Sequence, residues 1–342
     1  MAACRAMLRE GSYTFFAASL LLPRDVREPA SALYAFCRLA DDAVDKDTDH
    51  TTAVQRLRAR LDAAYAGRPH PFRPDRALAA VVARFGIPRA LPEALLQGFE
   101  WDVAGRRYET LAELEQYGAR VAGSVGAMMA LLMGVRSTDG LARACDLGVA
   151  MQLSNIARDV GEDARLGRLY LPLQWLREAG VDPDAWLARP AFTPAIAAVV
   201  KRLLDAAEVL YRRVDAGVAQ LPLACRPGIN AAHYLYADIG HEVARRGFDS
   251  VSQRARVSPS RKAWLLTRAA LQLAPSVPEQ AAPALEATRF LIEAATAVLP
   301  AAPRAGVTPP AWWDIGGRMV WVIELFERLE RQDRLGQVSQ TG

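Results

Sequence analysis

Apolar side chains recur at spacings of three and four residues along most of this chain, which is the pattern of amphipathic helices. Alternating apolar and polar positions, which predict strands, are scarce. Segments rich in proline and glycine divide the helical pattern at residues 67–75, 86–92, 171–184, 221–228 and 275–283. Residues 299–310 have the composition of a further loop, and an amphipathic segment follows it. The pattern predicts a single all-α domain over residues 1–342, with roughly eight to twelve helices.

Composition narrows the class of protein. Hydrophobic residues make up 51% and charged residues 23% of the chain, as in ordinary globular proteins. The net charge is +4 and the basic residues are dispersed, so we expect no nucleic-acid partner. The four cysteines form no CxxC pair, which favours a reducing cytoplasm over a disulfide or zinc scaffold. No G-x-G-x-x-G motif occurs, so no nicotinamide cofactor is expected.

The segment from Ser31 to Asp45, SALYAFCRLADDAVD, is an apolar helical pattern that ends in three aspartates. Steps of three or four residues place four polar side chains on one helix face: Tyr34, Arg38, Asp41 and Asp45. Asp42 falls outside this stripe and is predicted to pair with Arg38. Buried carboxylates are costly without a compensating cation, so this stripe predicts one.

A second stripe appears about 110 residues later, in MQLSNIARDVGEDARLGRLYLP (Met151 to Pro172). Steps of three, four and four residues again place four polar side chains on one helix face: Gln152, Asn155, Asp159 and Asp163. Carboxylate and amide oxygens without His or Cys favour Mg²⁺, with Mn²⁺ as the alternative ion. Two facing helices of this kind could clamp a diphosphate on metal ions, with Arg38 and Arg158 adding charge-assisted hydrogen bonds. The alternative is that the carboxylates form solvated pairs with arginine.

The two stripes resemble the aspartate-rich signatures of the squalene/phytoene synthases, the head-to-head prenyl transferases. Three further stretches also resemble this family: GSYTFFAASLLLP (Gly11 to Pro23), RYETLAELEQYGARVAGSVGAMM (Arg107 to Met129) and AAHYLYADIGHEVARRGFDSVSQRARVS, which begins at Ala231. The likeness extends from about Gly11 to Lys262, and within the family it is greatest to the bacterial phytoene synthases of the carotenoid pathway.

The resemblance implies an isoprenoid synthase fold around a central cavity, and a reaction. Two geranylgeranyl diphosphates would combine through prephytoene diphosphate to give phytoene and two diphosphates. The Mg²⁺ ligands implied are Asp41, Asp45, Asn155, Asp159 and Asp163. The residues implied to line the diphosphate and carbocation region are Tyr34, Arg38, Gln152, Arg158 and Tyr236, with Ser12 and Thr14 touching phosphate. Thr14 replaces a serine of the family pattern and keeps the hydroxyl.

The apolar segment that begins at Val121 would provide room for the prenyl chains. Val121, Val125 and Gly126 are expected to contact them, with Phe15 as a further lining residue. Tyr117 lies one turn earlier and is expected to stabilise a carbocation over its ring. The alternative for Tyr117 is a core tyrosine whose hydroxyl is hydrogen-bonded.

Three other functions compete with this one. A farnesyl diphosphate coupler would give squalene or dehydrosqualene, and the residues that decide chain length cannot be placed in space from sequence. An all-α Mg²⁺-dependent nucleotide pyrophosphohydrolase also uses acidic helices. A non-catalytic helical partner is expected to lose some of the five oxygen ligands, and all five are present.

Because the product is very apolar, we expect the protein to be cytoplasmic and peripherally bound to a membrane. The amphipathic segment from Trp312 to Arg331 is the expected contact, with Trp313, Trp321 and Leu325 on one side. Downstream carotenoid enzymes are further expected partners.

Overall fold

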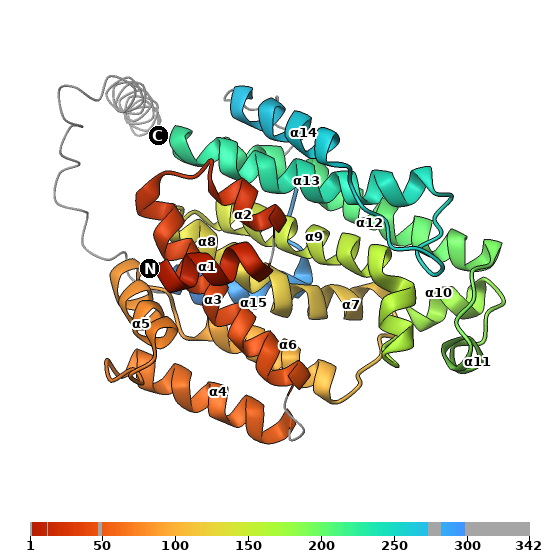
Figure 1. The fold of residues 1–342 in the computed structure, drawn as a ribbon, viewed down its shortest axis with the longest axis horizontal. Coiled ribbons are helices and arrows are strands. Elements are labelled where there is room, and N and C mark those ends of the chain that lie inside the picture. Colours follow the sequence, from red (N-terminus) through yellow and green to blue (C-terminus); the bar gives the residue numbers. More distant parts are fainter. Residues whose placement is uncertain (1, 12, 47–49, 273–281, 298–342) are drawn as a thin grey trace, which may run out of the picture.

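The structure is a computed structural model that describes residues 2–11, 13–46, 50–272 and 282–297. All regular elements in these residues are helices, so the all-α prediction is confirmed (Figure 1). The predicted loop at residues 299–310 and the amphipathic segment from Trp312 to Arg331 lie outside the described residues.

The helices follow one another in three groups along the chain. The first group is α1 (Ala2–Gly11), α2 (Tyr13–Ser19), α3 (Arg24–Lys46), α4 (His50–Tyr65), α5 (Arg73–Phe85) and α6 (Ala90–Val103). The second is α7 (Leu111–Gly118), the π-helix η1 (Ala119–Gly123), α8 (Ser124–Leu132), α9 (Thr138–Arg165), α10 (Leu173–Glu178) and α11 (Pro183–Ala188). The third is α12 (Pro194–Val218), the 3₁₀ turn η2 (Leu223–Cys225), α13 (Arg226–Arg245), α14 (Pro259–Leu271), the 3₁₀ turn η3 (Glu286–Thr288) and α15 (Arg289–Ala297).

Helix α9 is the central element. It is 28 residues long and packs against α12, α8, η1 and α13 (Figure 1). The Ser137 hydroxyl caps its first turn by accepting a hydrogen bond from Gly140 N at 3.2 Å. Most of its side chains are buried, so tertiary packing, rather than helix propensity alone, stabilises so long a helix.

Two glycines let α9 approach its neighbours closely. A methyl group on Gly148 would lie 2.4 Å from the Ala122 carbonyl oxygen, and one on Gly126 would lie 2.2 Å from the Ala144 carbonyl oxygen. Both contacts involve backbone, which cannot move aside as a flexible side chain can. The segment that contains Ala122 and Gly126 therefore packs closely on α9.

The region 171–184 differs from the predicted break between helices, because it contains the short helix α10 and the beginning of α11. Pro183 begins α11, and the Asp182 carboxylate accepts from Ala185 N at 2.7 Å as its N-cap. The proline that indicated a break in sequence therefore also begins a helix.

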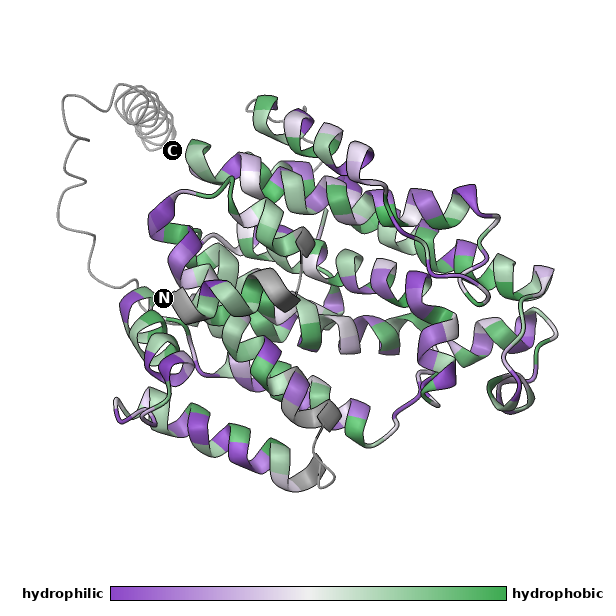
Figure 2. Cartoon of the chain, in the orientation of Figure 1, coloured by the Kyte–Doolittle hydropathy of each residue, from purple (hydrophilic) through white to green (hydrophobic). Residues whose placement is uncertain are grey.

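Hydrophilic and hydrophobic residues both occur along the outer helices, such as α4 and α14, as expected for helices with one buried face (Figure 2). Helix α14 lies outside α13 and packs on it (Figure 1). None of the described helices is both long enough and apolar enough to cross a bilayer.

Candidate active site

A cavity of about 300 Å³ lies between the long helices, and its wall is almost entirely apolar. Eight residues predicted to bind substrate line it. Five of them are Phe15, Tyr34, Gln152, Asn155 and Tyr236. The other three, Val121, Val125 and Gly126, come from η1 and α8. The structure thus brings together residues from six helical elements, α2, α3, η1, α8, α9 and α13, and from both acidic stripes.

The cavity is elongated along α9. Lining residues follow one face of this helix from Asn155 through Gln152 and Gly148 to Gly140. At about 1.5 Å per residue, this face is roughly 22 Å long. The end at Asn155 continues toward Asp159 and Asp163, whereas the Gly140 end is bounded by α12 and the end of α8. The site is therefore a tunnel with a polar mouth and an apolar interior.

Three aromatic rings lie near the mouth. The Phe15 ring centroid is 5.3 Å from that of Tyr236 and 6.2 Å from that of Tyr34. All three side chains also line the tunnel. Their ring faces offer negative electrostatic potential without a nucleophilic atom, which suits a bound carbocation.

Helix α3 carries the first acidic stripe to the tunnel, since Tyr34 lines it. Arg38 forms an ion pair with Asp42, with 2.9 Å between the Arg38 guanidinium and Asp42 Oδ1, so the predicted pairing of these two residues is confirmed. Asp41 and Asp45 lie on α3, and Thr14 lies on α2, but their side chains are outside the described part of the structure. Ser12 is also outside it.

Asp159 on α9 is held by two arginines. Arg158 Nε donates to Asp159 Oδ1 at 2.8 Å, and Arg254 Nε donates to the same oxygen at 2.8 Å. Arg254 also lies 3.2 Å from the Glu162 carboxylate. The carboxylate predicted to bind metal is thus surrounded by cations that could equally neutralise a diphosphate.

Asp163 lies one turn beyond Asp159. Burial raises the pKa of its carboxyl group to about 7, and the negative charges of Asp159, Glu162 and Asp102 act in the same direction. Arg168 opposes the shift of this pKa. The Asp163 carboxyl group therefore lies in a partly desolvated place with several other carboxylates near it.

Asp102 on α6 connects the mouth to a group of buried tyrosines. It accepts hydrogen bonds from the Tyr117 hydroxyl at 2.9 Å and the Tyr170 hydroxyl at 2.7 Å. Burial raises the pKa of Tyr117 well above its ordinary value, and the Asp102 charge adds to that shift. Tyr117 is not among the described residues that line the tunnel. This environment matches the alternative for Tyr117, a core tyrosine with a hydrogen-bonded hydroxyl, and its catalytic role stays a prediction.

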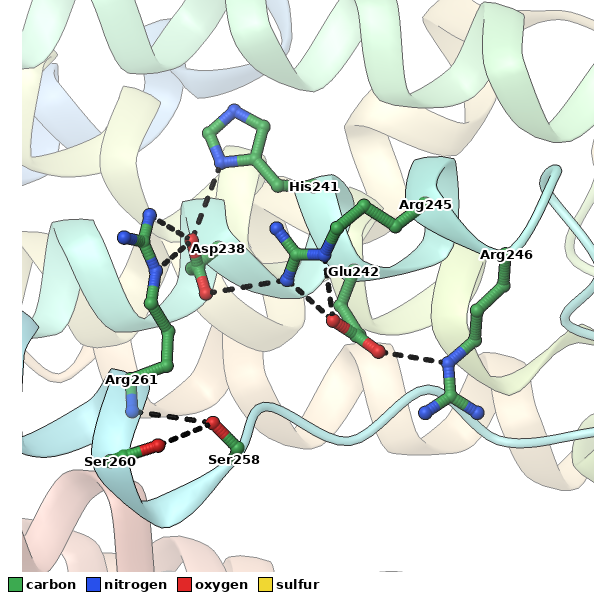
Figure 3. A network of polar contacts seen from close by, with 8 residues as sticks. All are labelled: Asp238, His241, Glu242, Arg245, Arg246, Ser258, Ser260 and Arg261. Atoms are coloured by element: carbon green, nitrogen blue, oxygen red, sulfur yellow. Dashed lines mark hydrogen bonds and ion pairs between the residues drawn. The ribbon is translucent and has the colours of Figure 1, made fainter.

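A segment between α13 and α14, residues 249–258, which we call the strap, carries Arg254 across α9. Gly161 N donates to the Ser250 carbonyl at 3.0 Å, so the strap is bonded to α9. Beyond it, Arg261 of α14 donates to Asp238 of α13 at 2.8 Å, and Glu242 pairs with Arg245 and Arg246 (Figure 3). This network joins α14 and the end of the strap to α13.

The donors on α9 fit a hard divalent cation. Asn155, Asp159 and Asp163 offer oxygen atoms along successive turns of one helix, without the nitrogen or sulfur ligands that zinc takes. No group of three or more Asp, Glu, His or Cys side chains in the described residues could hold a metal ion alone. The predicted site also needs Asp41 and Asp45, whose side chains are not described.

Sequence reasoning missed three residues of this region: Asp102, Arg143 and Arg254. Asp102 lies outside both acidic stripes, and nothing in its neighbourhood, EWDVAG, indicates a site. Arg254 had a weak signal, because it belongs to the basic end of a stretch that resembles the family pattern. Arg143 lines the tunnel about two and a half turns before the second stripe begins at Gln152.

The fold and the tunnel define an isoprenoid synthase, and solved structures agree. A dehydrosqualene synthase in complex with ligand has a TM-score of 0.72 and 31% identity, covering 78% of this chain and 94% of that one. Squalene synthase HpnC from Alicyclobacillus acidocaldarius has a TM-score of 0.67 and 25% identity, covering 72% and 94%. The predicted fold is therefore confirmed.

The chain belongs to the squalene/phytoene synthase family, whose sequence model matches residues 8–263. It is similar to a phytoene synthase of Rhodobacter capsulatus, at 56% identity over 79% of this chain and 81% of the relative. It is also similar to a phytoene synthase of Cereibacter sphaeroides, at 51% identity over 99% of this chain and 95% of the relative. The resemblance inferred from the sequence motifs is confirmed.

Proposed function

We propose that this protein is a phytoene synthase, which joins two geranylgeranyl diphosphates head to head and releases two diphosphates. The observation that carries the proposal is the tunnel with its polar mouth. From Asn155 to Arg143 its wall spans about 18 Å at about 1.5 Å per residue, close to the length of four extended isoprene units. The similarity to curated phytoene synthases supports the same substrate.

The reaction has two ionisations. In the first, the bond between carbon 1 and its diphosphate oxygen breaks, and the electron pair leaves with the diphosphate. The double bond of the second substrate attacks the cation, and a proton is lost as the cyclopropane of prephytoene diphosphate closes. In the second, this intermediate loses its own diphosphate, the cation rearranges, and loss of a second proton gives phytoene.

The side chains at the mouth and in the tunnel have separate tasks. Arg38, Arg158 and Arg254 would neutralise the charge that develops on the leaving diphosphate. The rings of Phe15 and Tyr236 would stabilise the carbocation at the point where the tunnel begins. The apolar wall excludes water, which would otherwise capture the cation as an alcohol.

We propose that Asn155, Asp159 and Asp163 of α9, together with Asp41 and Asp45 of α3, hold Mg²⁺. The bound ion would supply charge stabilisation for the departing diphosphate. The closeness of the Asp159 and Glu162 carboxylates to Asp163, on one side of α9, supports this assignment, because a bound cation would stabilise these charges together.

Contact with a membrane is also proposed, because the substrate is amphiphilic and the product is a hydrocarbon. Among the described residues, the outer face of α14 suits an anionic lipid surface. Trp264 is 50% exposed and Leu271 78% exposed, and α14 carries three cations and no acidic residue. Such a surface would receive the product and bring it to downstream carotenoid enzymes.

The test is a competition between geranylgeranyl and farnesyl diphosphates, given to the purified protein with and without Mg²⁺. We expect a forty-carbon hydrocarbon that forms only with metal. If the protein prefers farnesyl diphosphate and forms a thirty-carbon product, squalene or dehydrosqualene synthesis would be favoured. This function is the second candidate because the chain is 31% identical to a dehydrosqualene synthase. Absence of any hydrocarbon would contradict both functions.

A further inference from the structure

One charged side chain lines the apolar tunnel, and it lies far from the mouth. Among the described residues of the tunnel wall, Arg143 is the one that carries a full charge. It is twelve residues before Asn155 on α9, or about 18 Å along the helix axis. A diphosphate held at the mouth is therefore out of its reach, and Arg143 needs another explanation.

Arg143 is fixed in place by groups on the outer side of the tunnel. Its side chain is 3% exposed, and Nη2 donates to the Ala282 carbonyl at 2.9 Å and the Pro283 carbonyl at 3.4 Å. The same nitrogen lies 3.4 Å from the carboxylate of Asp146, which is fully buried. These acceptors draw the guanidinium toward the segment that leads to η3 and α15.

The aliphatic part of Arg143 packs against α12. A methyl group on Gly217 would lie 2.3 Å from Arg143 Cβ and 3.0 Å from Cγ, so the arginine stem fills the space that a side chain at 217 would need. Gly217 and Gly140 also line the tunnel at this end. Arg143 therefore crosses between α9 and α12 within one turn of the Gly140 end of the tunnel.

The groups that hold Arg143 include a part of the chain outside the shared family region. The family match ends at residue 263, whereas the two carbonyl acceptors belong to residues 282 and 283. Burying an arginine and an aspartate together carries a large desolvation cost, which their attraction only partly offsets. An apolar residue would seal the same helix contact without that cost.

We propose that Arg143, held by the carbonyls of Ala282 and Pro283, closes the far end of the tunnel and sets the longest prenyl chain that the enzyme accepts. The stem of Arg143 meets the terminal methyl groups of the substrate. A longer chain would have to move a buried cation away from its acceptors, whereas a leucine or methionine at this position could change rotamer at little cost. This inference rests on the proposed function and adds the residue that limits its substrate.

The alternative is that Arg143 only ties the segment around Pro283 to α9. In that case, loss of Arg143 would lower the free energy of unfolding and leave the choice between substrates unchanged. Substrate selectivity, measured on folded protein, therefore separates the two roles.

The experiment uses the full chain and diphosphates of fifteen, twenty and twenty-five carbons. Product formation from competing pairs gives the ratio of kcat/KM values, and thermal unfolding with unreactive thiolo-diphosphate analogues gives binding without catalysis. Arg143→Ala opens the end of the tunnel and should raise preference for the twenty-five-carbon chain by about ten-fold or more. Ala144→Leu fills the tunnel at the same level and should shift preference toward fifteen carbons.

The matched control is Arg213→Met. Arg213 also acts on the Asp146 charge but is not among the described lining residues, so its loss should alter stability without altering selectivity. If Arg143→Ala does not fold, Arg143→Met with Asp146→Asn removes both buried charges and leaves a movable side chain, which should admit the longer chain. Unchanged selectivity in the folded Arg143 variants would overturn the inference. A wild-type protein that forms no hydrocarbon would instead contradict the proposed function.

Discussion

Two carboxyl groups, the buried Asp146 and the partly buried Glu115, have raised pKa values. Burial raises the pKa of Glu115 on α7 to about 7, and the Asp146 charge adds to this while Arg213 opposes it. Burial likewise raises the pKa of Asp146 to about 6, against the charges of Arg143 and Arg213. Because the folded protein favours the protonated form of each group, both contribute stability at low pH that is lost as the pH rises.

Glu115→Gln should therefore flatten the dependence of stability on pH. Glu115 contributes fully below its ordinary pKa near 4.5, and the contribution disappears as the pH rises through about 7. The free energy of unfolding of the wild type should fall between pH 5 and pH 8 by on the order of 2 kcal/mol more than that of the variant. Urea denaturation of the full chain across this range measures the difference. Glu208→Gln, at an exposed position of α12, is the control and should keep the wild-type slope.

Spacing along a helix predicts which polar residues share a face. For this reason, side-chain contacts within one helix could be predicted from the sequence. Arg38 and Asp42 are one turn apart, and their predicted ion pair is present. Asp102 could not be predicted in this way, since its partners Tyr117 and Tyr170 are 15 and 68 residues away in sequence. Contacts of that kind depend on how the helices are arranged in space.

At the scale of the elements, the strap packs closely against α9 at a single glycine. A methyl group on Gly161 would lie 2.1 Å from the Val251 carbonyl oxygen and 2.7 Å from its carbon, so the strap contacts α9 where only glycine fits. The same strap carries Arg254 to Asp159. The position of the Arg254 guanidinium at the mouth of the tunnel thus depends on the close contact that Gly161 allows.

Gly161→Ala should displace the strap and lower kcat/KM by about ten-fold or more, while the helical content stays unchanged. Initial rates with geranylgeranyl diphosphate and far-ultraviolet circular dichroism measure the two quantities. Arg254→Ala should give a similar loss, and the double variant should lose little more than either alone, because both changes remove the same contact.

Gly240→Ala on α13 is the control for the alanine itself. Its added methyl group would meet only the flexible end of Leu204, at 3.1 Å, so the activity should remain. Full activity of Gly161→Ala would show that the strap position does not matter for the reaction.

The helices themselves were predictable, because apolar spacing is a local property, and proline and glycine mark most of their ends. The short helices α10 and α11 were missed, since they are too brief for a periodic pattern to emerge. The π-helix η1 was missed as well. One extra residue in a helical turn leaves no distinct signal in sequence, although such bulges are frequent at functional sites.

At the scale of the whole molecule, the tunnel arises from segments far apart in sequence. Leu8 of α1, Val121 of η1 and Leu221 beyond α12 all line it. The family resemblance implied a central cavity, but its length follows from the packing of α8 and α12 on α9. Those contacts involve glycines and an arginine whose roles no local pattern reveals.

The same arrangement leaves α14 on the outside of α13, with Trp264 and Leu271 exposed. We expect the protein to float with vesicles that contain phosphatidylglycerol and to remain in solution with purely zwitterionic vesicles, because α14 is basic and apolar on its outer face. Trp264→Ala with Leu271→Ala should lower the bound fraction several-fold. Phe192→Ala, which removes another exposed aromatic ring before α12, should leave it unchanged.

Substitution of Trp313 and Trp321 tests the other predicted contact in the same assay. If these changes abolish flotation and the α14 changes do not, the membrane contact belongs to the segment from Trp312 to Arg331. If the wild type remains in solution with every vesicle, contact with an anionic membrane is contradicted. In that case, the hydrocarbon product must leave the tunnel toward another protein rather than toward lipid, because water would not dissolve it.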